Sequence, residues 1–365
     1  MKRKKILHLI TSLEVGGTEI MLLKTLPGLQ QKFENRVCCL MSPGEIGNRL
    51  VSAGIQVDYL NISGWKDITK VFKLVNIVKT FQPDILTTYL LHADLIGRII
   101  GKLTGIKTII CSVRAWIRDP KYWPLLFLEH LTSPLVNHYL FNAHSVADLY
   151  QHKLLLPQSK ITIIPNGVDF KLFVSTNNPI SAKKRLGLPL KGKVIGFFGT
   201  FRDQKGLKYL IDAFAGLAIP DIYLLLAGYG PSEKALKDQV QKLGLTNKVY
   251  FTGEFKDIHL LLPAIDIFVL PSLYEGMSNS LLEAMVSGRP VITTNIPENR
   301  ELISDPENGL LVSTKDSFAI AKAIHTLISN PKLTTSQSRN NILKVRSTYD
   351  LSVINDRFLK FYENF

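Results

Sequence analysis

The sequence has few cysteines and no long apolar run. Its three cysteines, Cys38, Cys39 and Cys111, show no zinc-site or redox-motif spacing, so we expect buried thiols in a reducing compartment. No apolar stretch approaches the roughly 18 residues that a membrane-spanning helix needs. The apolar segment behind the N-terminal lysines ends at Glu14 without a small-residue cleavage site, which favours a first β-strand over a signal peptide. These absences predict a cytoplasmic protein.

Several ligand-binding signatures are missing as well. A G-x-G-x-x-G fingerprint is absent, which disfavours a dinucleotide site, and the absence of G-K-[ST] excludes a Walker loop. Basic and aromatic residues do not interleave in the manner of a nucleic-acid-binding surface, so nucleic acid is not an expected partner. The chain offers no D-x-D motif for a metal, so we predict that no metal and no resident cofactor are needed.

Acidic residues are scarce in one half of the chain. Residues 1–185 contain 24 Lys and Arg against 12 Asp and Glu, whereas residues 186–365 contain 20 against 18. An excess of positive charge suits an anionic lipid surface, a phosphorylated acceptor or nucleic acid, although scattered, solvated lysines would give the same count.

Apolar segments alternate between strand-like and helix-like patterns in two series, which predicts an α/β protein with two doubly wound parallel sheets. The expected domains are 1–175 and 176–345, followed by a C-terminal helix at 346–365. Strands are expected at 6–10, 37–41, 56–60, 85–91, 108–113, 138–143, 161–165, 193–199, 222–228, 249–253, 265–272, 290–294 and 309–312. Helices are expected at 18–29 with an interruption at Pro27, at 67–81, 206–217, 232–244 and 258–265, from 281, and from 316 to the end. Further helices are expected between several of the strands from 85 to 165.

Three glycine-containing turns each follow an expected strand and precede a helix. They are 15-VGGTE-19, 199-GTFRDQKG-206 and 227-AGYGPSEKAL-236. Glycine lets the backbone approach a ligand, and a helix N-terminus attracts an anion. Arg202 and Lys205 on the second turn would supply cations for a diphosphate. Plain tight turns, and a solvated basic turn at 199–206, remain the alternatives.

The segment 273-LYEGMSNSLLEAMVSGRPVI-292 brings two carboxylates into an apolar region. Asn279 or Ser280 is expected to cap a helix that begins near Leu281, and Ser280 with Glu283 fits a capping box. The functional alternative places the amides at this helix start under a phosphate, with Glu283 on ribose hydroxyls and Glu275 on sugar hydroxyls.

These motifs, in this order and together with 163-IIPNGVD-169, resemble the retaining nucleotide-sugar glycosyltransferases of family 4. The resemblance covers nearly the whole chain. It implies a GT-B fold, in which two Rossmann-like domains face each other across a cleft and the C-terminal helix packs back on the first domain. It also implies transfer of a sugar, with retention, from a nucleoside diphosphate sugar to an acceptor hydroxyl.

The resemblance also assigns roles to residues. Lys205 matches the family's cation for the donor diphosphate, and Arg202 is the expected second cation because Thr200 stands where the family has Arg. Glu275 would contact the donor hexose and Glu283 the ribose. The catalytic set is therefore Lys205, Arg202, Glu275 and His92; the donor-binding set is Gly16, Gly17, Gly199, Thr200, Gly228, Asn279, Ser280, Leu281 and Glu283; and the acceptor side holds Glu19 and Arg114. Arg114 occupies the position where many members have a sugar-contacting His, which leaves His92, alternatively a structural histidine, as the candidate.

The expected partners are a nucleotide-sugar donor, with UDP-sugar favoured, and a saccharide or lipid-linked acceptor in cell-surface polysaccharide synthesis. The apolar segment 116–128 and the basic first half suit peripheral attachment at the inner face of an anionic membrane. Two alternatives are an epimerase or phosphorylase of the same fold, and a non-catalytic protein that binds anionic ligands.

Overall fold

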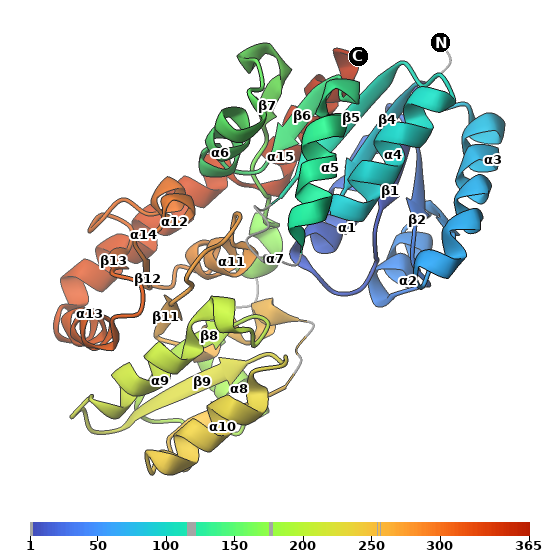
Figure 1. Cartoon of the computed structure of the whole chain (residues 1–365). Helices are drawn as coiled ribbons and strands as arrows, with labels where there is room; N and C mark the ends of the chain where they lie inside the picture. The colour runs from blue at the N-terminus through green and yellow to red at the C-terminus, as the bar shows by residue number, and fades with distance from the viewer. Residues whose placement is uncertain (1–2, 115–121, 175–177, 254, 256) are drawn as a thin grey trace. The chain divides into compact units, whose positions relative to one another are not determined.

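The computed structural model describes residues 3–114, 122–174, 178–253, 255 and 257–365 (Figure 1). The chain divides into two compact units. Unit 1 contains residues 1–167 and 351–365, and unit 2 contains residues 168–350. The divisions therefore fall at 167/168 and 350/351, near the 175/176 and 345/346 boundaries expected from the sequence.

Unit 1 is built on a parallel sheet of seven strands in the order β3-β2-β1-β4-β5-β6-β7. The strands are β1 Lys5–Ile10, β2 Glu34–Cys39, β3 Gln56–Tyr59, β4 Ile85–Tyr89, β5 Thr108–Val113, β6 His138–Phe141 and β7 Ile161–Ile163. The helices are α1 Gly17–Leu29, α2 Glu45–Ser52, η1 Trp65–Lys70, α3 Val71–Phe81, α4 Leu91–Leu103, α5 Trp123–Thr132, η3 Ser133–Leu135, α6 His144–Leu154, η4 Gln158–Lys160 and α15 Leu351–Glu363. The strand order reverses between β1 and β4, and such a switch point is where open sheets bind ligands.

Unit 2 repeats this plan with a parallel sheet of six strands in the order β10-β9-β8-β11-β12-β13. The strands are β8 Lys193–Phe198, β9 Ile222–Ala227, β10 Val249–Phe251, β11 Ile267–Leu270, β12 Val291–Thr294 and β13 Leu310–Val312. The helices are α7 Phe170–Val174, α8 Pro179–Arg185, η5 Asp203–Lys205, α9 Leu207–Ala215, α10 Glu233–Lys242, η6 Ile258–Leu260, η7 Leu262–Ala264, α11 Asn279–Val286, α12 Pro297–Leu302, α13 Ser317–Ser329 and α14 Pro331–Thr348. Here the order reverses between β8 and β11.

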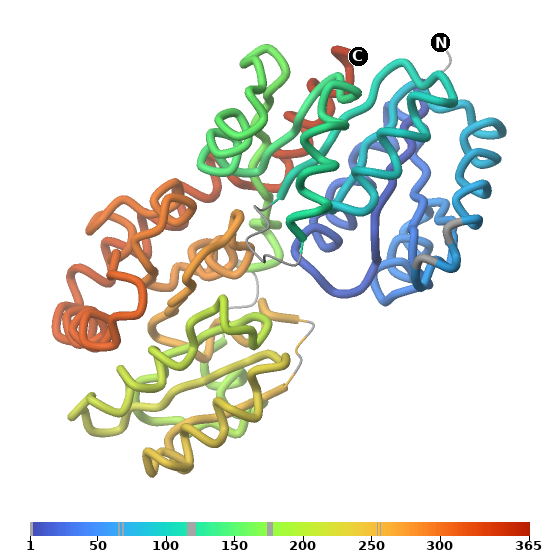
Figure 2. Tube along the Cα trace, in the orientation of Figure 1, coloured from blue at the N-terminus to red at the C-terminus, as the bar shows by residue number. Residues whose placement is uncertain are grey.

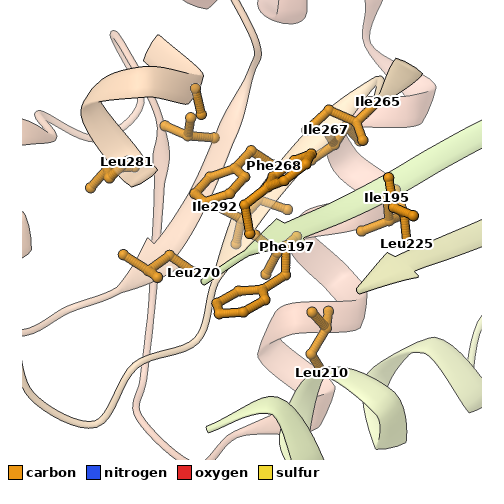
Figure 3. Packing of buried hydrophobic residues seen from close by; sticks show 14 of the residues in the cluster. Ile195, Phe197, Leu210, Leu225, Ile265, Ile267, Phe268, Leu270, Leu281 and Ile292 are labelled. Carbon is orange, nitrogen blue, oxygen red and sulfur yellow. The ribbon is translucent and has the colours of Figure 1, made fainter. Parts of the chain in front are cut away.

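The core of unit 2 explains why its strands read as continuous apolar runs. Phe197 of β8, Phe268 of β11 and Ile292 of β12 are fully buried, and they lie in one cluster with Leu210 of α9 and Leu281 of α11 (Figure 3). Parallel strands covered by helices on both faces have no solvent-facing side, so apolar residues are favoured at consecutive positions. The expected fold class, two doubly wound α/β domains, is confirmed.

The C-terminal helix α15 belongs to unit 1, and Figure 2 shows this red segment lying in the same unit as the blue N-terminal strands. The helix packs against α1. Its buried Tyr362 forms a hydrogen bond of 3.1 Å with Thr87 of β4. Residues from the two ends of the chain thus complete one core.

Local expectations needed three corrections. Helix α1 continues through Pro27 to Leu29, because a proline in the last turn removes a single hydrogen bond and leaves the turns before it intact. The expected helix at 258–265 is two short 3-10 turns, η6 and η7. Residues 171–192, to which the sequence analysis assigns no strand or helix, contain most of α7 and all of α8.

Candidate active site

In unit 2, candidate site residues predicted from the sequence lie at the switch point between β8 and β11. The turn 199–206 follows β8, and the loop 271–278 follows β11. Since parallel strands end at the same edge of a sheet, these two loops are neighbours. Backbone contacts join them, because the Leu273 amide donates to the Gln204 carbonyl at 2.8 Å and the Gln204 side-chain amide donates to the Tyr274 carbonyl at 2.8 Å.

An ion pair between a buried carboxylate and a partly exposed lysine lies where the two loops meet. The ammonium of Lys205 donates to Oε1 of Glu275 at 2.5 Å. The hydroxyl of Ser272, which is fully buried, donates to the same oxygen at 2.6 Å. Glu275 is thereby held at the edge of the sheet with a positive charge beside it. The sequence placed Lys205 and Glu275 in one site but did not predict that they contact each other.

The glycines of these turns make room for the close approach of neighbouring backbones. Gly206 has φ +63°, and a Cβ there would lie 2.2 Å from the carbonyl oxygen of Pro271. At Gly228, with φ +149°, a Cβ would overlap the carbonyl oxygen of Gly199. The Gly199 amide donates to Ala227 at 3.0 Å, so the turns after β8 and β9 are bonded together. The plain-turn alternative therefore holds in part, since these glycines also build the loops.

Helix α11 begins two residues earlier than expected. Its N-cap is Ser278, whose hydroxyl accepts from the Leu281 amide at 3.4 Å. The expectation that Asn279 or Ser280 caps this helix is wrong, because both residues already have helical positions. A capping box between Ser280 and Glu283 is excluded for the same reason.

The corrected start of α11 changes the setting of its polar residues. Glu283 lies in the second turn and is buried, with 8% of its surface exposed. The amide of Leu281 is engaged by Ser278, whereas we had expected it to be free for a phosphate. Asn279 and Ser280 are half-buried in the first turn.

Arg202 differs from Lys205 in its surroundings. Its side chain is exposed, and it makes no hydrogen bond or ion pair with any residue that the structure describes. The amide of Arg202 donates to the carbonyl of Thr200 at 3.1 Å, and the amide of Lys205 donates to the carbonyl of Arg202 at 2.8 Å. Both cations therefore lie on one short turn, with Lys205 engaged and Arg202 open to solvent.

In unit 1, Gly16 and Gly17 lie at the start of α1. Gly16 is the N-cap of α1, and a Cβ there would lie 2.3 Å from Oε2 of Glu19. Glu19 is buried and accepts from the Ser12 hydroxyl at 3.4 Å. Burial raises the pKa of Glu19, while hydrogen bonds from its own backbone amide and from Ser12 oppose that rise. The Glu19 carboxylate thus folds over the glycine turn.

His92 and Arg114 follow the adjacent strands β4 and β5. His92 is exposed in the first turn of α4, and its ring meets the ring of Tyr122 edge-on at 6.4 Å between centroids. Arg114 donates to Ser112 Oγ at 3.1 Å and to Asn166 Oδ1 at 3.2 Å. Burial lowers the pKa of Arg114. An exposed His92 is available to a ligand and is not a core histidine.

Sequence reasoning missed two polar residues that support these candidates. Ser272 lies beneath Glu275, and Asn166 lies beside Arg114. A serine at the end of the expected apolar strand 265–272 was a usable signal for Ser272. Asn166 lies in the quoted motif 163–169, but nothing local indicated its contact with Arg114, 52 positions away.

Over the described residues, no group of three or more His, Cys, Asp or Glu side chains could hold a metal ion. In the same part of the chain, no helix combines the length and the apolar character needed to cross a membrane.

Comparison with known proteins agrees with the motifs. Residues 15–172 match the sequence model described as Glycosyltransferase Family 4, and residues 180–344 match that of Glycosyl transferases group 1. The chain belongs to the family 4 glycosyltransferases. The fold of this transferase is accordingly GT-B, as the sequence led us to expect.

The transferase is similar to enzymes of bacterial surface polysaccharides. It is 28% identical over 80% of its length, and 78% of the relative, to a UDP-Gal:alpha-D-GlcNAc-diphosphoundecaprenol alpha-1,3-galactosyltransferase of Escherichia coli. It is 25% identical, over 84% of its length and 83% of the relative, to the capsular polysaccharide biosynthesis glycosyltransferase CapM of Staphylococcus aureus. The crystal structure of Anabaena HepE in complex with UDP-glucose superposes with a TM-score of 0.88 at 23% identity, covering 99% and 100% of the two chains.

Proposed function

We propose that this glycosyltransferase moves a hexose-type sugar from a UDP-sugar to a hydroxyl group of a saccharide or lipid-linked acceptor, with retention at the anomeric carbon. The observation that carries the proposal is the contact between Lys205 and Glu275 at the switch point of unit 2. It joins a cation suited to a diphosphate with a carboxylate suited to sugar hydroxyls.

Lys205 is proposed to bind the leaving diphosphate. An ammonium has three N–H donors, so Lys205 can hold Glu275 and still donate to a phosphate oxygen. Negative charge grows on the diphosphate as the bond to the sugar breaks, and a cation already in place stabilises that charge without rearrangement. Arg202, exposed on the same turn, would supply the second positive charge.

The carboxylates of Glu275 and Glu283 are proposed to bind different parts of the donor. Glu275 would accept from hydroxyls of the hexose, and Glu283, buried in α11, from the paired hydroxyls of the ribose. Retention would follow from attack on the face that the diphosphate leaves, with a departing phosphate oxygen taking the acceptor proton. No metal and no resident cofactor enter this scheme, because Lys205 and Arg202 provide the positive charge.

The acceptor and the site of action are proposed from unit 1 and from the relatives. The name of the E. coli relative gives it a diphosphoundecaprenol acceptor, and the S. aureus relative works in capsule synthesis. Helix α5 exposes Trp123, Phe127 and Leu131 at 67%, 64% and 57%, on one face at intervals of four residues. We assign this face, together with the exposed Lys102 of the neighbouring helix α4, to a peripheral contact with an anionic bilayer. Residues 116–121 of the expected apolar segment lie outside the described residues.

A donor screen tests the proposal. The chain is incubated with UDP- and GDP-sugars and a polyprenyl diphosphate sugar, and the released nucleoside diphosphate and the product anomer are measured. We expect UDP release with an α-linked product from an α-linked donor, unchanged by EDTA. A free sugar isomer or a sugar phosphate as product would refute transfer, and an inverted linkage would refute retention.

Lys205→Ala should lower kcat about 100-fold or more, since it removes a charge from the leaving group. Lys208→Ala is the matched control, because Lys208 is exposed one helical turn further along and its ammonium lies over the ring of Tyr209, 5.0 Å from the centroid. A Lys205→Ala enzyme with an unchanged rate would exclude this residue from the leaving-group site.

A further inference from the structure

The carboxylate of Glu275 has an asymmetric set of partners. Both hydrogen bonds that it accepts, from Lys205 and from Ser272, go to Oε1. Its other oxygen, Oε2, accepts none from the residues that the structure describes. A carboxylate held through one oxygen has the other available to a ligand, so the two partners of Oε1 decide where Oε2 points.

Of these two partners, only Ser272 is rigidly placed. Ser272 is fully buried, and its hydroxyl rotates about a single side-chain bond. Lys205 has a long, partly exposed side chain, and in the proposed reaction its ammonium is shared with the diphosphate. The Ser272 hydroxyl therefore remains as the fixed donor to Glu275 when the donor substrate binds.

A series of buried hydrogen bonds from Thr294 and Asn299 fixes the position of Ser272. The hydroxyl of Thr294, at the end of β12, donates to the Ser272 carbonyl at 2.5 Å. The side-chain amide of Asn299, in α12, donates to the Thr294 carbonyl at 3.0 Å and to the Thr293 hydroxyl at 2.7 Å. All four residues are at most 1% exposed. Buried hydrogen bonds of this kind fix side-chain positions, because breaking them leaves polar atoms without partners.

We propose that Ser272 is a positioning residue for sugar recognition, which orients Glu275 so that its Oε2 meets a hydroxyl of the donor hexose. The chain Asn299–Thr294–Ser272 connects α12 to that carboxylate. This inference rests on the proposed function, since it assumes that Glu275 contacts the sugar.

A positioning role of Ser272 predicts that its loss weakens recognition of the sugar but leaves binding of the nucleotide unchanged. Ser272→Ala removes the hydroxyl and retains the small side chain, and Lys205 stays in place for the diphosphate. We expect kcat/KM for the UDP-sugar to fall roughly 10- to 100-fold, as is typical when a reacting group is misplaced. The Kd for UDP, which has no hexose, should stay within about twofold of the wild-type value.

Three enzyme forms complete the experiment. In a Glu275→Ala background, Ser272→Ala should cause no further loss of kcat/KM, because the serine acts through that carboxylate. Thr294→Val should show the same selectivity for the sugar nucleotide with a smaller loss. Ser338→Ala is the matched control, since it removes a half-buried hydroxyl that bonds only within α14, and it should leave both constants unchanged.

The outcomes are distinct. Full activity in Ser272→Ala, or a parallel loss of UDP binding and turnover, would overturn the positioning role while the proposed function stands. An additive loss in the Glu275→Ala background would overturn it as well. If the wild-type chain releases nucleoside diphosphate from no donor, the proposed function fails and this inference fails with it.

Discussion

At the scale of single residues, His8 shows how a polar side chain can be buried within an apolar sheet. His8 lies in the middle of β1, fully buried. Its Nε2 donates to Oδ1 of Asn35 at 3.0 Å, and its Nδ1 accepts from the hydroxyl of Tyr89 at 3.1 Å. Both ring nitrogens are satisfied in the neutral form, and burial lowers the pKa of His8 to about 4, against the smaller opposing effect of Asn35.

Stability should therefore fall on mild acidification. Below pH 6.5 the unfolded chain binds a proton at His8 that the folded chain does not bind until about pH 4. Folding stability then rises with pH through this window and is lost as the pH falls. We expect His8 to contribute a loss of about 2 to 3 kcal/mol between pH 7 and pH 4.5. Urea unfolding of the wild type and of His8→Gln at both pH values measures it, and equal losses in the two proteins would contradict the assignment.

The residues of the candidate site could be predicted from the sequence more easily than their contacts. Lys205 and Glu275 each occupy a motif with a chemical reason for its residue type. Their ion pair spans 70 positions and depends on β11 lying beside β8, which is a matter of strand order that local patterns do not encode. The N-cap of α11 was misplaced because Ser278, Asn279 and Ser280 are all good caps, and tertiary packing selects among them.

At the level of elements, the strands followed their apolar runs closely. The expected strand at 108–113 coincides with β5, and most others extend one or two residues beyond the observed ends. The short helices α2 and α12 were missed, because elements of 8 and 6 residues carry too little periodicity to be recognised.

Helices α4 and α5 are joined by a buried charge pair. Arg98 of α4 is fully buried and donates to Oε1 of Glu129 at 3.2 Å and to the Thr132 hydroxyl at 3.2 Å. Burial raises the pKa of Glu129 to about 7, although Arg98 opposes the rise. This contact fixes the inner face of α5, so that Phe127 and Leu131 remain on the outer face.

The exposed face of α5 should determine membrane binding. Replacement of Phe127 and Leu131 by serine removes apolar area that would enter a bilayer, and we expect at least a tenfold weaker association with vesicles that contain anionic phospholipid. Sedimentation with vesicles of about 30% phosphatidylglycerol provides the measurement. Phe318→Ser is the control, because Phe318 is 79% exposed but belongs to α13 of unit 2.

Vesicle binding of the double serine variant at the wild-type level would exclude this face of α5 as the contact. Equal binding of the wild type to neutral and anionic vesicles would exclude an electrostatic contribution to membrane binding.

At the scale of the whole molecule, the difference in net charge between the two units is smaller than the difference between the two halves of the sequence. Unit 1 contains 22 Lys and Arg against 13 Asp and Glu, and unit 2 contains 22 against 17. The basic residues 171 and 183–185, counted with the first half, belong to unit 2. Unit 1 keeps the larger positive excess, and the proposed contact with an anionic bilayer would make use of this charge.

The proposed reaction requires a sugar nucleotide to bind at Lys205, Glu275 and Glu283. A crystal structure of the chain with a UDP-sugar is the most direct measurement. We predict diphosphate oxygens within hydrogen-bond distance of Lys205 Nζ, ribose hydroxyls on Glu283, and the hexose against Oε2 of Glu275. A nucleotide bound where it contacts none of these three side chains would contradict the account.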